Sequence, residues 1–347
     1  MSGGVDSSVA AALLVEQGYD CVGMTMRVAS GEGREHSDKA CCTVEAAGDA
    51  RRVADKLGIP HFTVNFVERF EREVIEDFAA EYAAGRTPNP CARCNQRVKF
   101  GALYEKCVAL EADFIATGHY ARKVERNGRV GLQRAVYRAK DQTYNLAGLG
   151  QAQLRRALFP LGEMTKEEAR AIARERSLVT WDKPESQEIC FVPQDDYRAF
   201  LDARVGRGQP GPIVNTRGEV VGQHSGLTHY TIGQRKGLGI AAPRPYFVLK
   251  LDMQNNVLFV GHEEETGDTH LVADEVVWGA MAPQAEPFAC TVQIRYRHEP
   301  VPATVTASDD GASLDIALER PERGITPGQW AVCYDGDVVL AAGLIRG

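Results

Sequence analysis

The chain has 347 residues, of which 44% are hydrophobic and 25% are charged, and its formal net charge is −7. This length exceeds what one ordinary hydrophobic core supports, so we expect two or three domains of a soluble globular protein. The sequence contains no run of about 18 apolar residues and opens with no basic-then-apolar leader, so we expect neither a membrane span nor secretion. The acidic balance argues against nonspecific coating of nucleic acid, although a local basic patch is compatible with it.

The first 120 residues alternate between helix and strand patterns. Helices are predicted over residues 5–17, 39–57, 68–84 and 96–110, and strands over residues 21–28, 61–67 and 114–121. Such alternation predicts a parallel sheet with helices on both faces. Asn127-Gly128 lies between two alternating runs and predicts a β-hairpin over residues 124–136.

Residues beyond 205 contain mainly short β-rich runs, separated by turn signals such as Asn255-Asn256 and Asp335-Gly336. This pattern predicts small barrels or sandwiches, with a seam between two of them near residue 268. We therefore expect an α/β domain over residues 1–205, followed by β-rich domains over residues 206–267 and 268–347.

The stretch SGGVDSS at residues 2–8 leads directly into the first predicted helix. A helix N-terminus offers N–H groups and a partial positive charge to an anion, and Gly3 and Gly4 let a phosphate approach the backbone. The serine hydroxyls add donors, and Asp6 would cap N–H groups or meet a magnesium ion on the nucleotide. The loop lacks the Gly-Lys-Ser/Thr of a Walker A motif, which favours cleavage that releases pyrophosphate. The alternative is a Gly-Ser tail that caps a helix.

Cys91 and Cys94 form a C-x-x-C pair within GRTPNPCARCNQRVKFG (85–101), a loop that its prolines stiffen. The basic side chains beside them would favour the nucleophilic thiolate: Arg93, Arg97 and Lys99. The alternatives are a structural pair, a thioredoxin-type redox pair and a zinc site, although a zinc site would need a second ligand pair. The nine cysteines are odd in number and irregularly spaced. They predict a reducing cytoplasm, with a few thiols kept for chemistry, rather than a disulfide framework.

Eight motifs follow one another along the chain. They are SGGVDSS (2–8), GRTPNPxxxCN (85–95), ATGHYAR (116–122), KDQTYNL (140–146), EICFVP (188–193), TIGQRKGLGI (231–240), IRYRH (294–298) and TPGQ (326–329). Together they closely resemble the bacterial tRNA-specific 2-thiouridylases over essentially the whole chain. The resemblance implies a Rossmann-like PP-loop domain of the adenine nucleotide α-hydrolase type, followed by two small β-rich domains that bind tRNA.

The activity implied by this resemblance is sulfur transfer to the wobble uridine of tRNAs of the Glu, Gln and Lys type. ATP would adenylate the uracil carbonyl oxygen and so make it a good leaving group, and a cysteine-borne sulfur would displace AMP. A persulfide can supply this sulfur once a second thiol takes up the other sulfur atom. The resemblance therefore implies ATP and Mg²⁺ as cofactors, tRNA as substrate, and a sulfur-donor relay protein or a cysteine desulfurase as partner.

The resemblance also implies roles for individual residues. Cys94 matches the nucleophile and Cys190 matches the persulfide carrier, and the two can form a disulfide after the sulfur has left. The implied nucleotide-binding residues are Ser2, Gly3, Gly4, Val5, Asp6, Ser7, Ser8, Met26 and Gly118. The implied tRNA contacts are Asn89, Pro90, Cys91, His119, Lys140, Asp141, Gln142, Arg295, Tyr296 and Gln329. A basic and aromatic pair such as Arg295-Tyr296 suits phosphate contact and base stacking in an unpaired loop.

Cys91 departs from the family pattern, because the better-known members carry aspartate at this position. Aspartate can accept a proton or a hydrogen bond from the base, and cysteine replaces it poorly. With Cys94 and Cys190, Cys91 makes three thiols, the number that holds a [4Fe–4S] cluster with one iron left open. A persulfide route and a cluster-dependent route therefore both stay open. Iron content after anaerobic purification and the variant Cys91→Ser would separate them.

A second departure lies at the start of the chain. Family members have a hydrophobic strand before the SGGVDSS loop, and here only Met1 precedes it. We expect the true start to lie upstream of Met1, which the reading frame before this codon would reveal.

Two further functions stay open. One is an ATP-dependent thiolase that acts on another RNA or on a small molecule, and the other is an RNA-binding relative that has lost catalysis. The β-rich modules and the KDQTY sequence favour tRNA over a small substrate. Pyrophosphate release with unmodified tRNA would discriminate among these functions.

Overall fold

The computed structural model describes residues 1–28, 44–184 and 189–346, which form an α/β body followed by two β-rich units. The fold class predicted from the sequence is thereby confirmed. The helix predicted over residues 39–57 is described from Val44 onward, and its first residues lie outside the described ranges. Within those ranges, no helix combines the length and the apolar character needed to cross a membrane.

The strands of the α/β body form two short parallel pairs. β1 (Gly23–Arg27) pairs with β2 (His61–Asn65), and β3 (Ile115–Ala116) pairs with β6 (Ala157–Leu158). The predicted parallel direction is confirmed, but among the described residues the sheet is divided into these two pairs. The strand predicted over residues 114–121 is shorter than expected, and residues 117–120 form a loop instead.

Three helices pack against one another beside these strands: α1 (Val5–Glu16), α2 (Val44–Leu57) and α9 (Lys166–Glu175). Val9, Val53 and Ala169 lie in their common core and are fully buried. The alanines of α1 and α9 keep these helices close, because small side chains permit a short interaxial distance. The start of α1 is thus held on a rigid support.

Two long helical runs follow, each with a π-helical middle. The first consists of α3 (Val67–Phe70), η1 (Glu71–Ile75) and α4 (Glu76–Ala83), and the second of α5 (Pro90–Arg93), η2 (Cys94–Ala102) and α6 (Leu103–Ala109). The second run begins six residues before the helix predicted over residues 96–110, so the segment with Cys91 and Cys94 is helical rather than a stiff loop. The physical reason is that Asn89 caps this helix and Pro90 suits its first position.

The predicted hairpin is confirmed as β4 (Ala121–Arg126) and β5 (Arg129–Arg134). Asn127 and Gly128 both have positive φ, which is the conformation that a type I′ turn requires. The hairpin extends the C-terminal sheet, because Gln133 of β5 pairs with Val338. Short helices follow it: η3 (Arg138–Lys140), α7 (Thr143–Leu146) and α8 (Gln151–Arg156).

The middle unit is a four-stranded sheet in the order β8-β7-β10-β9. Its strands are β7 (Gly211–Asn215), β8 (Val220–His224), β9 (Phe247–Asp252) and β10 (Val257–Gly261). The short helices around it are η4 (Pro193–Asp195), α10 (Tyr197–Val205), η5 (Leu227–His229) and η6 (Glu263–Glu265). The pair β7–β10 is parallel and the other pairs are antiparallel.

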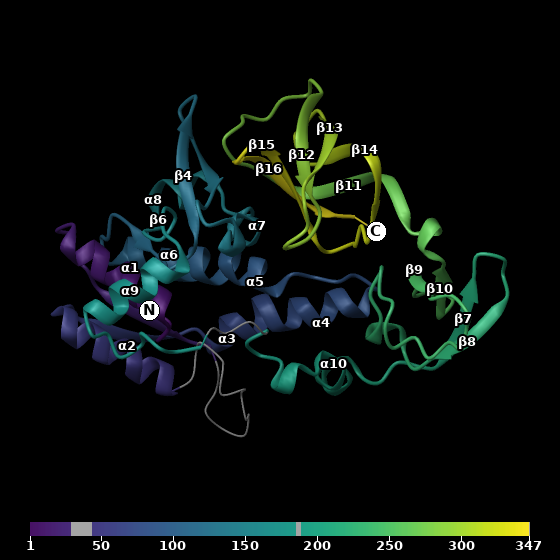
Figure 1. Cartoon of the computed structure of the whole chain (residues 1–347), viewed down its shortest axis with the longest axis horizontal. Coiled ribbons are helices and arrows are strands. Elements are labelled where there is room, and N and C mark those ends of the chain that lie inside the picture. Colours follow the sequence, from purple (N-terminus) through teal and green to yellow (C-terminus); the bar gives the residue numbers. More distant parts are fainter. Residues whose placement is uncertain (29–43, 185–188, 347) are drawn as a thin grey trace.

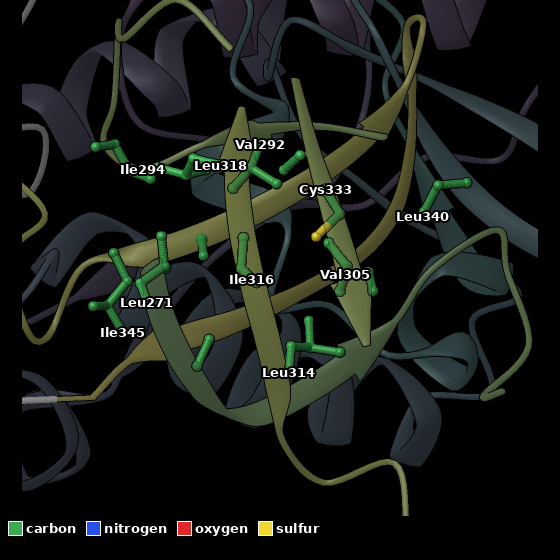
Figure 2. Close-up of a cluster of buried hydrophobic side chains, with 14 of the residues drawn as sticks. Leu271, Val292, Ile294, Val305, Leu314, Ile316, Leu318, Cys333, Leu340 and Ile345 are labelled. Atoms are coloured by element: carbon green, nitrogen blue, oxygen red, sulfur yellow. The ribbon is translucent and has the colours of Figure 1, made fainter. Parts of the chain in front are cut away.

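The C-terminal unit is a closed six-stranded barrel in the order β11-β14-β13-β12-β15-β16, with β16 pairing back to β11. Its strands are β11 (Gly267–Trp278), β12 (Phe288–Gln293), β13 (Val301–Ala307), β14 (Leu314–Arg323), β15 (Trp330–Asp335) and β16 (Val338–Ile345). Figure 2 shows its core, in which Leu314, Ile316 and Leu318 extend inward from β14. Alternate residues of this strand point inward because the side chains of a strand alternate between its faces.

The barrel packs on the α/β body through a second core. Trp330 and Tyr334 of β15 lie in this core with Phe100 of η2 and Tyr144 of α7. Figure 1 shows α5 and α7 between the α/β body and the barrel, while α4 and α10 run toward the middle sheet. The helix that carries Cys94 therefore lies close to the barrel.

Candidate active site

The SGGVDSS stretch forms the turn that begins α1, and two neighbouring segments close on it. Gly3 has a φ of +68°, and a Cβ there would collide with the carbonyl oxygen of Ala46 in α2. On the other side, a Cβ at Gly118 would lie 2.6 Å from the carbonyl carbon of Asp6. Because its N-cap is Gly4, α1 carries no capping side chain, and its first N–H groups suit an anion. This geometry supports the prediction that the loop binds nucleotide phosphates.

The polar side chains of the loop bind one another and the neighbouring helix. The hydroxyls of Ser7 and Ser8 both donate to the carbonyl oxygen of Gly4, and Ser8 is fully buried. Asp6 accepts hydrogen bonds from the Tyr120 hydroxyl at 2.9 Å and from Nζ of Lys166 in α9 at 2.6 Å. The sequence pattern predicted that Asp6 caps N–H groups or meets a magnesium ion. The ion pair between Asp6 and Lys166 was not predicted.

The loop at residues 117–120 joins the nucleotide loop to the cysteine-bearing helix. Gly118 lies against Asp6, while the next residue, His119, packs against both Phe100 of η2 and Phe159. Nδ1 of His119 hydrogen bonds with the Thr117 hydroxyl at 2.8 Å. Burial, and secondly the charge of Lys99, lower the pKa of His119 well below its ordinary value. His119 is therefore neutral at physiological pH.

Cys94 and Cys190 lie against one apolar cluster. Cys94 is the first residue of η2, and Cys190 directly precedes Phe191, which is part of the cluster. Met26 of β1 packs on the same cluster, while Cys91 is exposed on α5. Across residues 1–28, 44–184 and 189–346, no three His, Cys, Asp or Glu side chains form a group that could hold a metal ion. The structure thus brings Cys94 and Cys190 to one cluster without assembling a three-thiol site.

The two arginines beside the cysteines are bound to acids. Arg93 is 6% exposed and contacts Glu275 of β11 at 2.9 Å and Asp77 at 3.6 Å, while Arg97 donates to Asp77 at 2.8 Å. These ion pairs compensate the positive charge of Arg93 and Arg97, which the sequence pattern had predicted to favour the thiolate. Sequence reasoning missed both acids because they lie in distant segments.

Amide side chains hold the two ends of α5. The Asn89 side chain accepts from the N–H of Ala92 and donates to Oδ1 of Asn145, each at 3.0 Å. Nδ2 of Asn95 donates to the backbone oxygen of Asn145, also at 3.0 Å. Asn95 is 2% exposed, and its Oδ1 has no hydrogen-bond partner among the described residues. No role was predicted for Asn95 or Asn145. The available signal was that Asn89 and Asn95 flank the C-x-x-C segment, one on each side.

The predicted tRNA contacts in the α/β body are largely engaged inside the protein. Asp141 accepts from the N–H of Ala135 at 2.8 Å and from the Thr143 hydroxyl at 2.6 Å. The Gln142 side chain accepts from the N–H of Tyr120 at 2.9 Å. Pro90 is buried at the start of α5, and Lys140 ends η3. The Asp141 and Gln142 side chains thus have partners within the protein, and Gln142 holds the backbone of Tyr120.

The predicted contacts in the barrel lie outside its strands, after β12 and directly before β15. Arg295 is exposed, although it donates to the backbone oxygen of Arg323 at 2.9 Å, and the Tyr296 ring lies 6.3 Å from that of Tyr144. Gln329 instead reaches back, because its Nε2 donates to the backbone oxygen of Thr87 at 2.7 Å. Arg295 is thus exposed beside the half-buried Tyr296, and Gln329 connects the barrel to the segment before α5.

Comparison with known families defines the class of the protein. Three family models match in succession: the tRNA methyl transferase HUP domain over residues 1–194, the tRNA methyl transferase PRC-barrel domain over residues 198–262, and the aminomethyltransferase β-barrel domain over residues 268–345. The chain therefore combines a nucleotide-binding HUP domain with two small β domains.

Individual relatives specify the family. The chain is 50% identical to the tRNA-specific 2-thiouridylase MnmA of Carboxydothermus hydrogenoformans, a match that covers 100% of this chain and 96% of the relative. It is 47% identical to the enzyme of the same name from Heliobacterium modesticaldum (99% and 91% covered) and 49% identical to that of Symbiobacterium thermophilum (100% and 90%). The chain belongs to the family of tRNA-specific 2-thiouridylases.

Proposed function

We propose that this protein is an ATP-dependent enzyme that converts the wobble uridine of tRNA into 2-thiouridine. One observation carries the proposal: Cys94 and Cys190 pack on the same cluster, and the loop that carries Gly118 and His119 connects the helix of Cys94 to the nucleotide loop. The relatives named as tRNA-specific 2-thiouridylases support the substrate and the sulfur chemistry.

The proposed reaction has two stages. The uracil carbonyl oxygen first attacks the α-phosphate of ATP, so that pyrophosphate leaves and the oxygen carries AMP. The outer sulfur of a persulfide on Cys190 then attacks the ring carbon that bears this oxygen and expels AMP. Finally the Cys94 thiolate attacks Sγ of Cys190, which releases thiouridine and leaves a Cys94–Cys190 disulfide for a thiol reductant to open. A sulfur-relay protein or a cysteine desulfurase would reload Cys190.

The nucleotide loop fits its part in this reaction. The glycine backbone and the start of α1 would bind the phosphates of ATP. Magnesium is held mainly by substrate phosphates and by one or two carboxylates, and Asp6 is the carboxylate within this loop. Asp6 would then exchange its bond to Lys166 for the ion, which leaves the Lys166 ammonium beside the phosphates.

The geometry favours the persulfide over a [4Fe–4S] cluster. A cluster on Cys91, Cys94 and Cys190 would need the three thiols around one site, whereas Cys91 is exposed and the described residues contain no metal-binding group. These residues do not fit a cluster in this structure.

A thiolation assay on unmodified tRNA with ATP, and with cysteine and a cysteine desulfurase as the source of persulfide sulfur, tests the proposal. Pyrophosphate release together with thiouridine formation is the expected result. ATP-independent methylation of the tRNA would instead indicate the methyltransferase activity for which the matching family model is named. We expect Cys94→Ser and Cys190→Ser to abolish thiolation and Cys91→Ser to reduce it only modestly. If anaerobic protein contains iron and Cys91→Ser is as inactive as the other two variants, the cluster route is correct.

A further inference from the structure

The barrel grips one end of the segment that leads into α5. The N–H of Thr87 donates to the carbonyl oxygen of Pro327 at 2.8 Å, and Nε2 of Gln329 donates to the Thr87 oxygen at 2.7 Å. Gly328 lies between them, and a Cβ there would lie 3.1 Å from the carbonyl carbon of Thr87. The barrel backbone thus lies directly on this segment.

The barrel also binds the far end of this segment, at Arg93. Nη1 and Nη2 of Arg93 donate to the two carboxylate oxygens of Glu275 at 2.9 and 3.3 Å. The Arg93 side chain is 7% exposed, so its charge needs a partner, and Asp77 shares its own charge with Arg97. Arg93 in turn holds the pKa of the Glu275 carboxyl below its ordinary value.

The backbone of Glu275 has an unusual conformation for a strand. Its φ is +50°, and the pairing of β11 with β16 shifts register between Asp274 and Val277. Such bulges re-aim a side chain, and a positive φ in a non-glycine residue is maintained only when surrounding contacts favour it. The neighbouring Asp274 keeps its pairing and binds Arg346 at the surface instead. The bulge therefore directs Glu275, and not the neighbouring Asp274, toward the cysteine-bearing helix.

We propose that Glu275 is a positioning residue for Cys94, acting through Arg93. Arg93 directly precedes Cys94 in a continuous helix, so the ion pair from the barrel sets the orientation of the turn that bears the thiol. The hydrogen bonds to Thr87 hold the opposite end of this segment. The residues predicted to face the target base lie between Thr87 and Arg93. The barrel that contacts tRNA thereby also places the reacting thiol. This inference rests on the proposed thiolation and adds a role for the barrel in it.

Two matched variants of the whole chain test this role, Glu275→Ala and Asp274→Ala. Each removes from β11 one carboxylate that binds an arginine, but only Glu275 contacts the cysteine-bearing helix. Because a shift of about 1 Å can cost about a hundredfold in rate, we expect Glu275→Ala to lower kcat for thiolation roughly ten- to a hundredfold. The KM for tRNA should stay within about twofold of that of the unmodified protein, since neither Glu275 nor Arg93 is among the predicted tRNA contacts.

A second readout does not depend on turnover. The rate at which iodoacetamide alkylates Cys94 is measured over a range of pH by peptide mass spectrometry. Glu275→Ala should shift this profile, while Asp274→Ala should leave it and kcat unchanged. Wild-type kcat and alkylation in Glu275→Ala, or an equal loss in Asp274→Ala, would overturn the positioning role. Absence of thiolation in the unmodified protein would refute the proposed function, and the alkylation profile would still decide the role of Glu275.

Discussion

Gly118→Ala adds one methyl group at the place where the 117–120 loop lies against the nucleotide loop. The new Cβ would lie 2.6 Å from the carbonyl carbon of Asp6 and 2.7 Å from the nitrogen of Ser7, whereas ordinary contact begins at 3.4 Å. The two backbones must therefore separate by about 0.8 Å. Overpacking of this kind costs about 1–3 kcal/mol. The displaced atoms belong to the first turn of α1, so the KM for ATP should also rise, by roughly tenfold for about 1.4 kcal/mol of lost binding.

Gly48→Ala is the matched control, because Gly48 lies within α2 and, among the described residues, no atom outside its own helix backbone lies within 4 Å of its Cβ position. Alanine at this site should stabilise the helix by about 0.5–1 kcal/mol and leave the KM for ATP unchanged. Urea unfolding supplies the free energies, and pyrophosphate release at varied ATP supplies the KM. The reasoning fails if Gly118→Ala unfolds at the same urea concentration as the unmodified protein and keeps its KM.

Four further variants examine the amide contacts, the buried histidine and the barrel core. Asn145→Leu removes the acceptor for Asn89, which should cost about 1 kcal/mol and lower kcat, whereas Asn145→Asp keeps an acceptor and should retain more activity. His119 has a lowered pKa in the folded state, so the unfolded state binds more protons and the free energy of unfolding should fall as pH drops below about 6.5. His119→Gln should make this fall shallower in urea titrations at several pH values, and an unchanged slope would contradict the assignment. Ile316→Ala, in the core of Figure 2, should cost about 2–5 kcal/mol without changing the KM for ATP.

Local sequence patterns predicted the features that neighbouring residues produce. The hairpin at Asn127-Gly128 and the glycine-rich start of α1 both depend on backbone conformations that a few adjacent residues impose. The helix around Cys94 was predicted too late, because the two prolines were interpreted as loop residues. In the structure Pro90 occupies the first helical position, which requires no N–H donor.

Contacts between distant segments were not predictable from such patterns. Gln329 matched a family position for tRNA contact, yet its amide binds Thr87, because the barrel lies on that segment. Arg93 was expected to favour a thiolate, and its charge is instead directed to Glu275, 182 residues away. A buried charge takes whichever acid the packing brings within reach, and local spacing does not specify that partner.

The sequence by itself indicated the class of chemistry, because its eight ordered motifs resemble the tRNA-specific 2-thiouridylases and this resemblance implied a nucleotide loop and two reacting cysteines. Only the tertiary structure decided how these parts meet. Cys94 and Cys190 reach one cluster because aromatic side chains of two segments share a core, and Cys91 stays outside it. The physical reason is that residue type sets what a side chain can do, while the burial of distant segments against each other sets which groups lie within reach.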